Sequence, residues 1–195
     1  MNIYIDFDDT ITRSVENVVR IINKRYNKNV NWRDIQEWDF SDVYPDIPIK
    51  EIVKVFGEQE FFDTLRLQPH ALFVLSRFSR NNTVTIVSKV DMKAMTRKGE
   101  WIKEHIQNLG IDVSFVGIPL GASKGNIDMS DGIMIDDNVQ FLKETNAKYK
   151  ILYNCGRAFD KTQGWEGLCV SNWWELKNVL YDIISKEKGI TNGKI

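Results

Sequence analysis

The chain has 195 residues and a formal net charge of −1, and 43% of its residues are hydrophobic and 27% charged. This length predicts one domain, or one core domain with a modest insertion, and the composition is that of an ordinary globular protein. Because basic residues are not in excess, the charge gives no support to a role on a nucleic-acid polymer or on a membrane surface.

Short apolar runs recur along the chain and predict strands that are covered on both faces, because they are rich in β-branched residues and lack a clean alternation with polar ones. In chain order these runs are 2–5, 83–87, 113–118, 132–135, 150–153 and 167–170. Helical patterns lie between them, at 14–27, 31–38, 48–56, 69–80, 91–108, 137–147 and 172–185. The alternation predicts an α/β fold, a doubly wound (Rossmann-like) parallel sheet of five to six strands.

The interval between the first two predicted strands breaks this alternation. Residues 6–82 carry helical patterns and no convincing strand, and they are too numerous for a simple crossover. We therefore expect a small helical cap inserted after the first strand. The predicted organisation is a core domain formed by 1–13 and 70–187, a cap formed by 14–69 and a flexible tail formed by 188–195.

Polar clusters follow four of the predicted strands at the point where each strand ends. They are Asp6-Phe7-Asp8-Asp9-Thr10, Ser88-Lys89, the glycine-rich segment GASKGN with Lys124, and Asp136-Asp137-Asn138. Ligands of an open parallel sheet bind outside the carboxyl ends of its strands, and right-handed connections would bring all four clusters to that edge. The edge would then hold carboxylates, a hydroxyl and at least one ammonium group.

The crowded acids need a compensating positive charge. At an effective dielectric of about 20, two like charges about 5 Å apart cost roughly 3 kcal/mol. Mg²⁺ prefers hard oxygen ligands such as Asp6 and Asp136, and a backbone carbonyl near Asp8 is a candidate third ligand. The same groups suit phosphoryl transfer onto Asp6 or Asp8, with the cation and a lysine stabilising the phosphoryl oxygens. The alternative is an acidic turn that only caps the following helix.

The order of these motifs resembles that of the haloacid dehalogenase superfamily of phosphohydrolases. DFDDT, TIVS, the lysine and MIDDN follow one another across residues 3–138, and their joint occurrence is far more specific than any one motif. The resemblance implies that Asp6 is the nucleophile and that Asp8 protonates the leaving oxygen and then activates the hydrolytic water. It also implies that Mg²⁺ binds at Asp6, Asp8 and Asp136. Asp137 would support this metal shell.

The same resemblance implies that Ser88 and Lys124 hold the phosphoryl group. Lys124 lies in a glycine-rich segment, where a lysine is often only solvated, and Lys98 is the alternative phosphate-binding lysine. Lys89 adds a further positive charge beside the phosphate site, directly after Ser88. The other interpretation of Ser88 is a serine that merely ends a strand. The assignment of Ser88 to phosphate binding rests on its position after that strand.

Other segments resemble the 5'(3')-deoxyribonucleotidase family more specifically. They are FFDTLRLQPHALFVL at 61–75, WDF at 38–40 and a K-x-x-W-[IV] pattern at 98–102. Two positions depart from the family pattern, because Lys89 stands where the family has a hydroxyl or small residue and His70 where it has a glycine. The resemblance implies a nucleoside monophosphate as substrate, with a preference that Lys89 could alter.

Aromatic residues of the insertion are candidates for stacking on a nucleobase, and Trp38 and Phe61 are predicted to bind the substrate. The alternative for both, and for Phe40 and Phe62, is packing inside the cap, the usual fate of aromatic residues on short helices. A small cap closing over the site would admit compact phosphate esters and exclude macromolecules. The expected partner is therefore a small-molecule phosphate ester, and a homodimer is left open.

The leading hypothesis is a Mg²⁺-dependent phosphatase that acts on a (deoxy)ribonucleoside monophosphate through an aspartyl-phosphate. Another small phosphometabolite would suit the same mechanism. A phospho-accepting receiver module also combines acids, a hydroxyl and a lysine, but there an acid pair comes first, whereas here a second acid pair comes last. A non-catalytic binding protein gains no support, because all four motifs are intact.

The cysteine pattern and the amino terminus bear on the compartment. Cys155 and Cys169 lie apart without a CxxC pattern, which favours a reducing compartment and leaves a disulfide open. The segment MNIYIDFDDT has neither a basic region nor a long apolar run, and no stretch approaches the length of a membrane span. The expected location is the cytoplasm.

Overall fold

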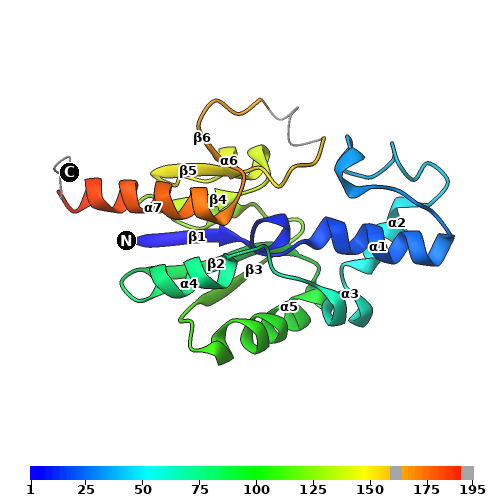
Figure 1. The fold of residues 1–195 in the computed structure, drawn as a ribbon, viewed down its shortest axis with the longest axis horizontal. Coiled ribbons are helices and arrows are strands. Elements are labelled where there is room, and N and C mark those ends of the chain that lie inside the picture. The colour runs from blue at the N-terminus through cyan, green and yellow to red at the C-terminus, as the bar shows by residue number, and fades with distance from the viewer. Residues whose placement is uncertain (159–163, 190–195) are drawn as a thin grey trace.

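The computed structural model describes residues 1–158 and 164–189. Within them, one sheet of six parallel strands has the order β3-β2-β1-β4-β5-β6 (Figure 1). The strands are β1 (Asn2–Asp6), β2 (Thr83–Val90), β3 (Ser114–Pro119), β4 (Gly132–Asp136), β5 (Tyr149–Tyr153) and β6 (Leu168–Val170). Each predicted apolar run forms one of these strands, so the predicted doubly wound α/β sheet is confirmed.

Helices fill the intervals between the strands. The α-helices are α1 (Ser14–Tyr26), α2 (Ile49–Val55), α3 (Gln59–Thr64), α4 (Ala71–Ser79), α5 (Met92–His105), α6 (Val139–Glu144) and α7 (Trp173–Glu187). Shorter helical turns are η1 (Phe7–Ile11), η2 (Trp32–Asp34), η3 (Gln107–Leu109) and η4 (Lys124–Asn126). Among the described residues, the structure contains no helix with the length and apolar character that crossing a membrane requires.

The two faces of the sheet pack against different helices. Ile133 and Ile135 of β4 belong to a large buried cluster that includes apolar residues of α4, α5 and α7. Met134, between them in sequence, packs instead with Val139 and Leu142 of α6. Successive side chains of a strand point to opposite faces, so a strand covered on both faces carries consecutive apolar residues, as β4 does at 133–135.

A mainly helical segment separates β1 from β2 and extends beyond the carboxyl edge of the sheet (Figure 1). It contains α1, η2, α2 and α3, whereas α4 packs against β2 and α7. The division of the chain into a core of 1–13 and 70–187 and a cap of 14–69 stays an interpretation. Of the predicted tail, residues 190–195 lie outside the described residues.

Helix prediction within this segment is wrong in two places. Of the predicted helix at 31–38, only the 3-10 helix η2 forms, because the Asp42 carboxylate holds the amides of Gln36 and Glu37 in a turn. Helix α3 is absent from the sequence prediction, because six residues are too few to display a helical period.

Candidate active site

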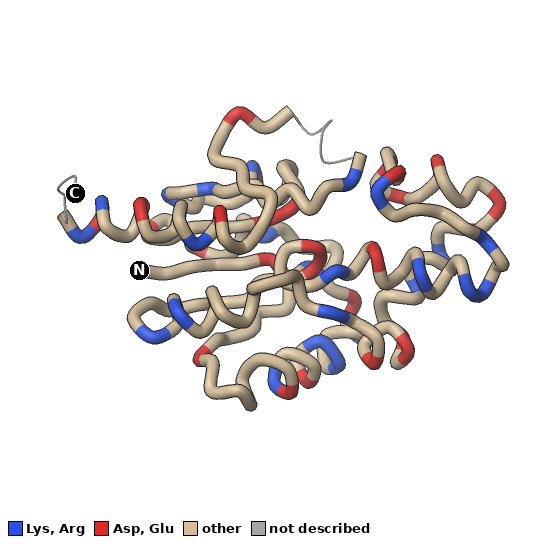
Figure 2. The backbone as a smooth tube through the Cα atoms, in the orientation of Figure 1, with Lys and Arg blue, Asp and Glu red and all other residues tan. Residues whose placement is uncertain are grey.

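Asp6 ends β1 at the centre of the carboxyl edge of the sheet. Parallel pairing places Asp6 beside Val87 of β2, and Ile5 beside Ile135 of β4. Ser88 follows the first of these partners and Asp136 the second, so the topology brings a hydroxyl and another acid next to Asp6. Figure 2 shows acidic residues at the end of β1 and in the turn that follows it.

Asp6, Asp136 and Asp137 form a buried cluster of carboxylates. One oxygen atom from each lies within 4.8 Å of the others. Burial raises the pKa of Asp6 to about 7. It also raises the pKa of Asp136 and Asp137 above the ordinary value. Because these hard oxygen donors are costly to keep charged without a cation, the cluster fits the predicted Mg²⁺.

Lys124 lies among the same acids. It is fully buried, and its ammonium donates to Asp6 Oδ1 at 2.5 Å and to Asp136 Oδ2 at 2.6 Å. Burial alone would lower the pKa of Lys124, but the two carboxylates outweigh this effect and hold the pKa above its ordinary value. The ammonium therefore stays charged, and the alternative of a solvated loop lysine is wrong.

Asp8 has a different set of partners. Its carboxylate accepts hydrogen bonds from Ser14 Oγ at 2.6 Å, Lys98 Nζ at 2.6 Å and Ser88 Oγ at 3.3 Å. Lys98 is also buried, and it donates to Ser88 Oγ at 2.9 Å. The structure thus brings Lys98, the alternative phosphate-binding lysine, into the same site as Lys124.

The third carboxylate of the cluster comes from Asp137, which the sequence analysis expects to support the metal shell. The side chain of Asp8 is bonded to Lys98 and is not part of the cluster. In the turn after β1, Asp8 has extended rather than helical backbone angles. A metal ligand from the backbone carbonyl of Asp8 stays a prediction.

Arg157 is a site residue that the sequence prediction missed. It is 3% exposed, and its guanidinium donates to Asp9 Oδ2 at 3.1 Å and to Asp137 Oδ2. Asp9 is therefore a supporting acid of the site. The position of Arg157 in the sequence could have revealed it. Arg157 follows the predicted strand at 150–153, and the segment after that strand also starts from the carboxyl edge of the sheet, where the site lies.

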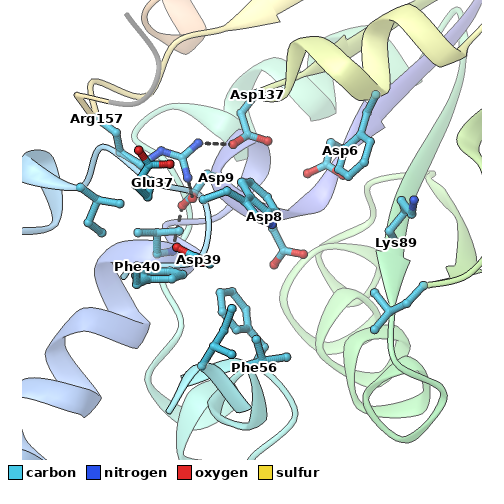
Figure 3. A pocket seen from close by; sticks show the side chains of 17 residues that line it. Asp6, Asp8, Asp9, Glu37, Asp39, Phe40, Phe56, Lys89, Asp137 and Arg157 are labelled. Atoms are coloured by element: carbon cyan, nitrogen blue, oxygen red, sulfur yellow. Dashed lines mark hydrogen bonds and ion pairs between the residues drawn. The ribbon is translucent and has the colours of Figure 1, made fainter. Parts of the chain in front are cut away.

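A cavity of about 400 Å³ opens over these groups (Figure 3). Its charged lining residues are Asp6, Asp8, Asp9, Glu37, Asp39, Lys89, Asp137 and Arg157. Its apolar lining residues are Val15, Ile35, Trp38, Phe40, Ile49, Val53, Phe56, Leu120 and Phe141. The cavity therefore has an ionic end at the sheet edge and an apolar wall contributed mainly by the helical segment.

The two aromatic residues predicted to bind substrate differ in position. Trp38 is 54% exposed, lines the cavity and meets Phe141 edge to face, with ring centroids 6.4 Å apart. Phe61 is fully buried, packs against Phe56 and Phe62, and does not line the cavity. The substrate-binding prediction for Phe61 is therefore corrected, because its ring belongs to the interior of the helical segment.

Lys89 also lines the cavity, from the strand that carries Ser88. It is half-buried, and its Nζ lies 4.8 Å from the ring centroid of Phe141, whose ring also lies 5.0 Å from Lys124 Nζ. Within the described part of the chain no ion pair involves Lys89. Its charge is thus available to an anion in the cavity.

Comparison with known proteins identifies the family. Residues 1–187 match the model of the family described as 5' nucleotidase, deoxy (pyrimidine), cytosolic type C protein. The chain belongs to this nucleotidase family. It is 29% identical over 150 residues to a 5'(3')-deoxyribonucleotidase of Clostridium acetobutylicum, an alignment that covers 77% of this chain and 79% of that protein. The nucleotidase family consists of phosphoric monoester hydrolases, as the sequence motifs predict.

Solved structures agree with the nucleotidase assignment at the level of the fold. A haloacid dehalogenase-like hydrolase from Streptococcus pneumoniae is 16% identical, with a TM-score of 0.58 and coverage of 93% of this chain and 97% of that one. A Bacillus subtilis protein described as a HAD hydrolase and bound to magnesium is 12% identical, with a TM-score of 0.56 and coverage of 92% and 97%. The chain therefore shares the fold of these hydrolases.

Proposed function

We propose that this nucleotidase is a Mg²⁺-dependent phosphatase that hydrolyses the phosphomonoester of a (deoxy)ribonucleoside monophosphate. The observation that carries the proposal is that Asp6 and Asp8, each bonded to a buried lysine, line one cavity of about 400 Å³. A cavity of this size takes one small ligand. Its ionic end suits a phosphate and its apolar wall suits a nucleoside.

In the first step, a carboxylate oxygen of Asp6 attacks the phosphorus atom of the substrate. The bond between phosphorus and the nucleoside oxygen breaks, and Asp8 donates a proton to that leaving oxygen. The products of this step are the free nucleoside and an aspartyl-phosphate on Asp6.

In the second step, a water molecule attacks the phosphorus of the aspartyl-phosphate. Asp8, now a carboxylate, accepts a proton from this water, and the bond between phosphorus and Asp6 breaks. Inorganic phosphate leaves and both carboxyl groups return to their starting states.

Cationic side chains and a hydroxyl hold the phosphoryl group during both steps. Lys124 and Ser88 supply an ammonium and a hydroxyl beside Asp6, and Lys89 adds a charge from the cavity wall. Lys98 orients Asp8 through its hydrogen bond of 2.6 Å. Asp6, Asp136 and Asp137 would hold Mg²⁺, which would supply positive charge opposite the phosphoryl oxygens.

The apolar wall supports a nucleoside as the leaving group. Trp38 of the helical segment and Phe141 of α6 both line the cavity, and their edge-to-face contact forms one continuous aromatic surface. Aromatic rings stack on any nucleobase, because every base has a π-face. A sugar phosphate would leave most of this surface without contact.

The test is phosphate release from a panel of deoxyribonucleoside and ribonucleoside monophosphates, sugar phosphates and phosphoserine. Each substrate is assayed with Mg²⁺, with EDTA and with the Asp6→Asn variant. The exposed Asp182 of α7 offers a matched control, Asp182→Asn, which removes one carboxylate far from the site.

We expect Mg²⁺-dependent release from nucleotides that Asp6→Asn abolishes and that Asp182→Asn leaves unchanged. Faster release from sugar phosphates or phosphoserine would support the phosphatase mechanism but contradict a nucleotide as the substrate. If the folded protein released no phosphate from any member of the panel, the proposed activity would be wrong.

A further inference from the structure

The loop that follows β5 places a buried arginine between two acids of the site. Arg157 donates through Nη1 to Asp9 Oδ2 at 3.1 Å and through Nη2 to Asp137 Oδ2. Figure 3 shows the guanidinium between these two carboxylates at the upper end of the cavity. All three side chains are at most 7% exposed, so both bonds are shielded from solvent.

The two acids connect Arg157 to different parts of the molecule. Asp137 belongs to the carboxylate cluster with Asp6 and Asp136. Asp9 accepts a hydrogen bond at its other oxygen from the backbone amide of Val15, at 3.0 Å, in the first turn of α1. Arg157 thus links the acid cluster to the first helix of the helical segment.

The backbone of the same loop contacts the helical segment directly. The amide of Ala158 donates to the carbonyl of Arg33 in η2 at 2.8 Å. One loop therefore reaches the acid cluster through a side chain and the helical segment through its backbone. The loop is thus held both by the Arg157 side chain and by the backbone of Ala158.

We propose that Arg157 is a positioning residue for the bound cation, because it fixes the carboxylate of Asp137 in the orientation that faces Asp6 and Asp136. This inference rests on the proposed function, which places the cation at those acids. A guanidinium has a rigid planar fork of donors, so it orients a carboxylate more strictly than a lysine ammonium does. Partners that orient metal ligands in this way typically contribute about 10- to 100-fold to metal affinity.

The test measures Mg²⁺ and Mn²⁺ binding to the substrate-free protein by titration calorimetry, together with its melting temperature in EDTA. The variants are Arg157→Lys, which keeps the charge and loses the planar fork, and Arg157→Gln, which loses both. Arg25 offers a matched control, because it also bridges two carboxylates, Glu58 and Glu60, but on the surface of the helical segment. The control variant is Arg25→Lys.

We expect Arg157→Lys to weaken metal binding by about 10- to 100-fold and Arg25→Lys to leave it unchanged. If Arg157→Gln fails to fold, Arg157→Lys decides the question. A folded Arg157→Lys protein that binds both metals as tightly as the wild type would overturn the inference and leave the proposed function intact. A wild-type protein that binds neither metal would overturn both.

Discussion

At the scale of single residues, the exposed fraction of a side chain separates the roles of Trp38 and Phe61. Trp38 is 54% exposed and lines the cavity. Its apolar ring surface stays in contact with water, which is unfavourable, unless a ligand covers it. Phe61 is fully buried, with its ring centroid 5.5 Å from Phe56 and 5.1 Å from Phe62. We therefore expect Trp38 to contribute to substrate binding and Phe61 to stability.

Substituting the two residues is expected to have opposite consequences. Trp38→Ala should raise KM for a nucleotide by about 5- to 150-fold, equivalent to roughly 1–3 kcal/mol of stacking on a base. It should lower the free energy of unfolding by about 1 kcal/mol or less, since little buried surface is lost. Phe61→Ala should cost about 3–5 kcal/mol of unfolding free energy through a buried cavity.

The measurements are steady-state kinetics and urea unfolding of each variant. Phe61→Leu serves as the milder control, which keeps the protein folded during the assays. If Trp38→Ala left KM unchanged for every nucleotide, the stacking role of this residue would be wrong.

At the scale of elements, the position of Lys124 depends on a close approach between η4 and the end of α6. A Cβ atom on Gly125 would collide with the carbonyl oxygen of Glu144. Ser123 Oγ donates to the side chain of the same glutamate at 2.8 Å, which ties the two elements together. Glycine at 125 is therefore what allows the turn to present Lys124 to the acids.

We expect Gly125→Ala to destabilise the protein by roughly 1–3 kcal/mol and to lower kcat, because the backbone must shift to relieve the collision and Lys124 moves with it. Gly121→Ala is the matched control in the same loop, since a Cβ there meets no atom within 4 Å. Thermal unfolding and kcat of both variants are compared. Equal behaviour of the two alanine variants would contradict this account of the turn.

A histidine at the start of α4 adopts a backbone conformation that favours glycine. His70, where the resemblance to the deoxyribonucleotidases implies a glycine, adopts a φ of 67° at the N-cap of α4. Glycine takes this left-handed conformation without the Cβ penalty of roughly 1–2 kcal/mol. The His70 ring packs against Trp174, with ring centroids 4.9 Å apart, which offsets part of the cost.

At the scale of the whole molecule, the buried acids couple folding to pH and to the cation. Burial raises the pKa of Asp6 from 3.8 to about 7. The folded metal-free protein therefore binds this proton more tightly than the unfolded chain does. The resulting stability is complete below about pH 4 and is lost as the pH rises through about 7.

In EDTA, deprotonation of Asp6 should lower the free energy of unfolding as the pH rises from about 4 to about 8. The expected decrease is on the order of 4 kcal/mol. Asp6→Asn should remove this part of the pH dependence. Because metal ligands must be deprotonated, Mg²⁺ at the proposed site should restore stability at a pH of about 8, by about 2.7 kcal/mol at 100 times its dissociation constant.

Urea unfolding of the wild type and of Asp6→Asn, with EDTA and with Mg²⁺, measures both effects. A wild type and an Asp6→Asn variant with the same pH dependence would show that Asp6 is not the group responsible.

The sequence by itself determined the strands, their parallel sheet and the family. Buried parallel strands are apolar on both faces, so runs such as GIMI at 132–135 are visible without any tertiary information. Because parallel strands end at one edge, the order of polar clusters also predicted that Asp6, Ser88, Lys124 and Asp136 meet. The strands and the meeting of these groups follow from local pattern and topology, whereas the family followed from the resemblance of the motifs to those of known phosphohydrolases.

Tertiary structure alone decided which groups share a hydrogen bond and which rings face the cavity. Arg157 reaches Asp137 from a loop 20 residues away, and no local pattern specifies that contact. Trp38 and Phe61 carry the same apolar signal in the sequence, yet one lines the cavity and the other is interior. Side-chain direction in irregular segments depends on distant packing, and a single sequence does not encode that packing locally.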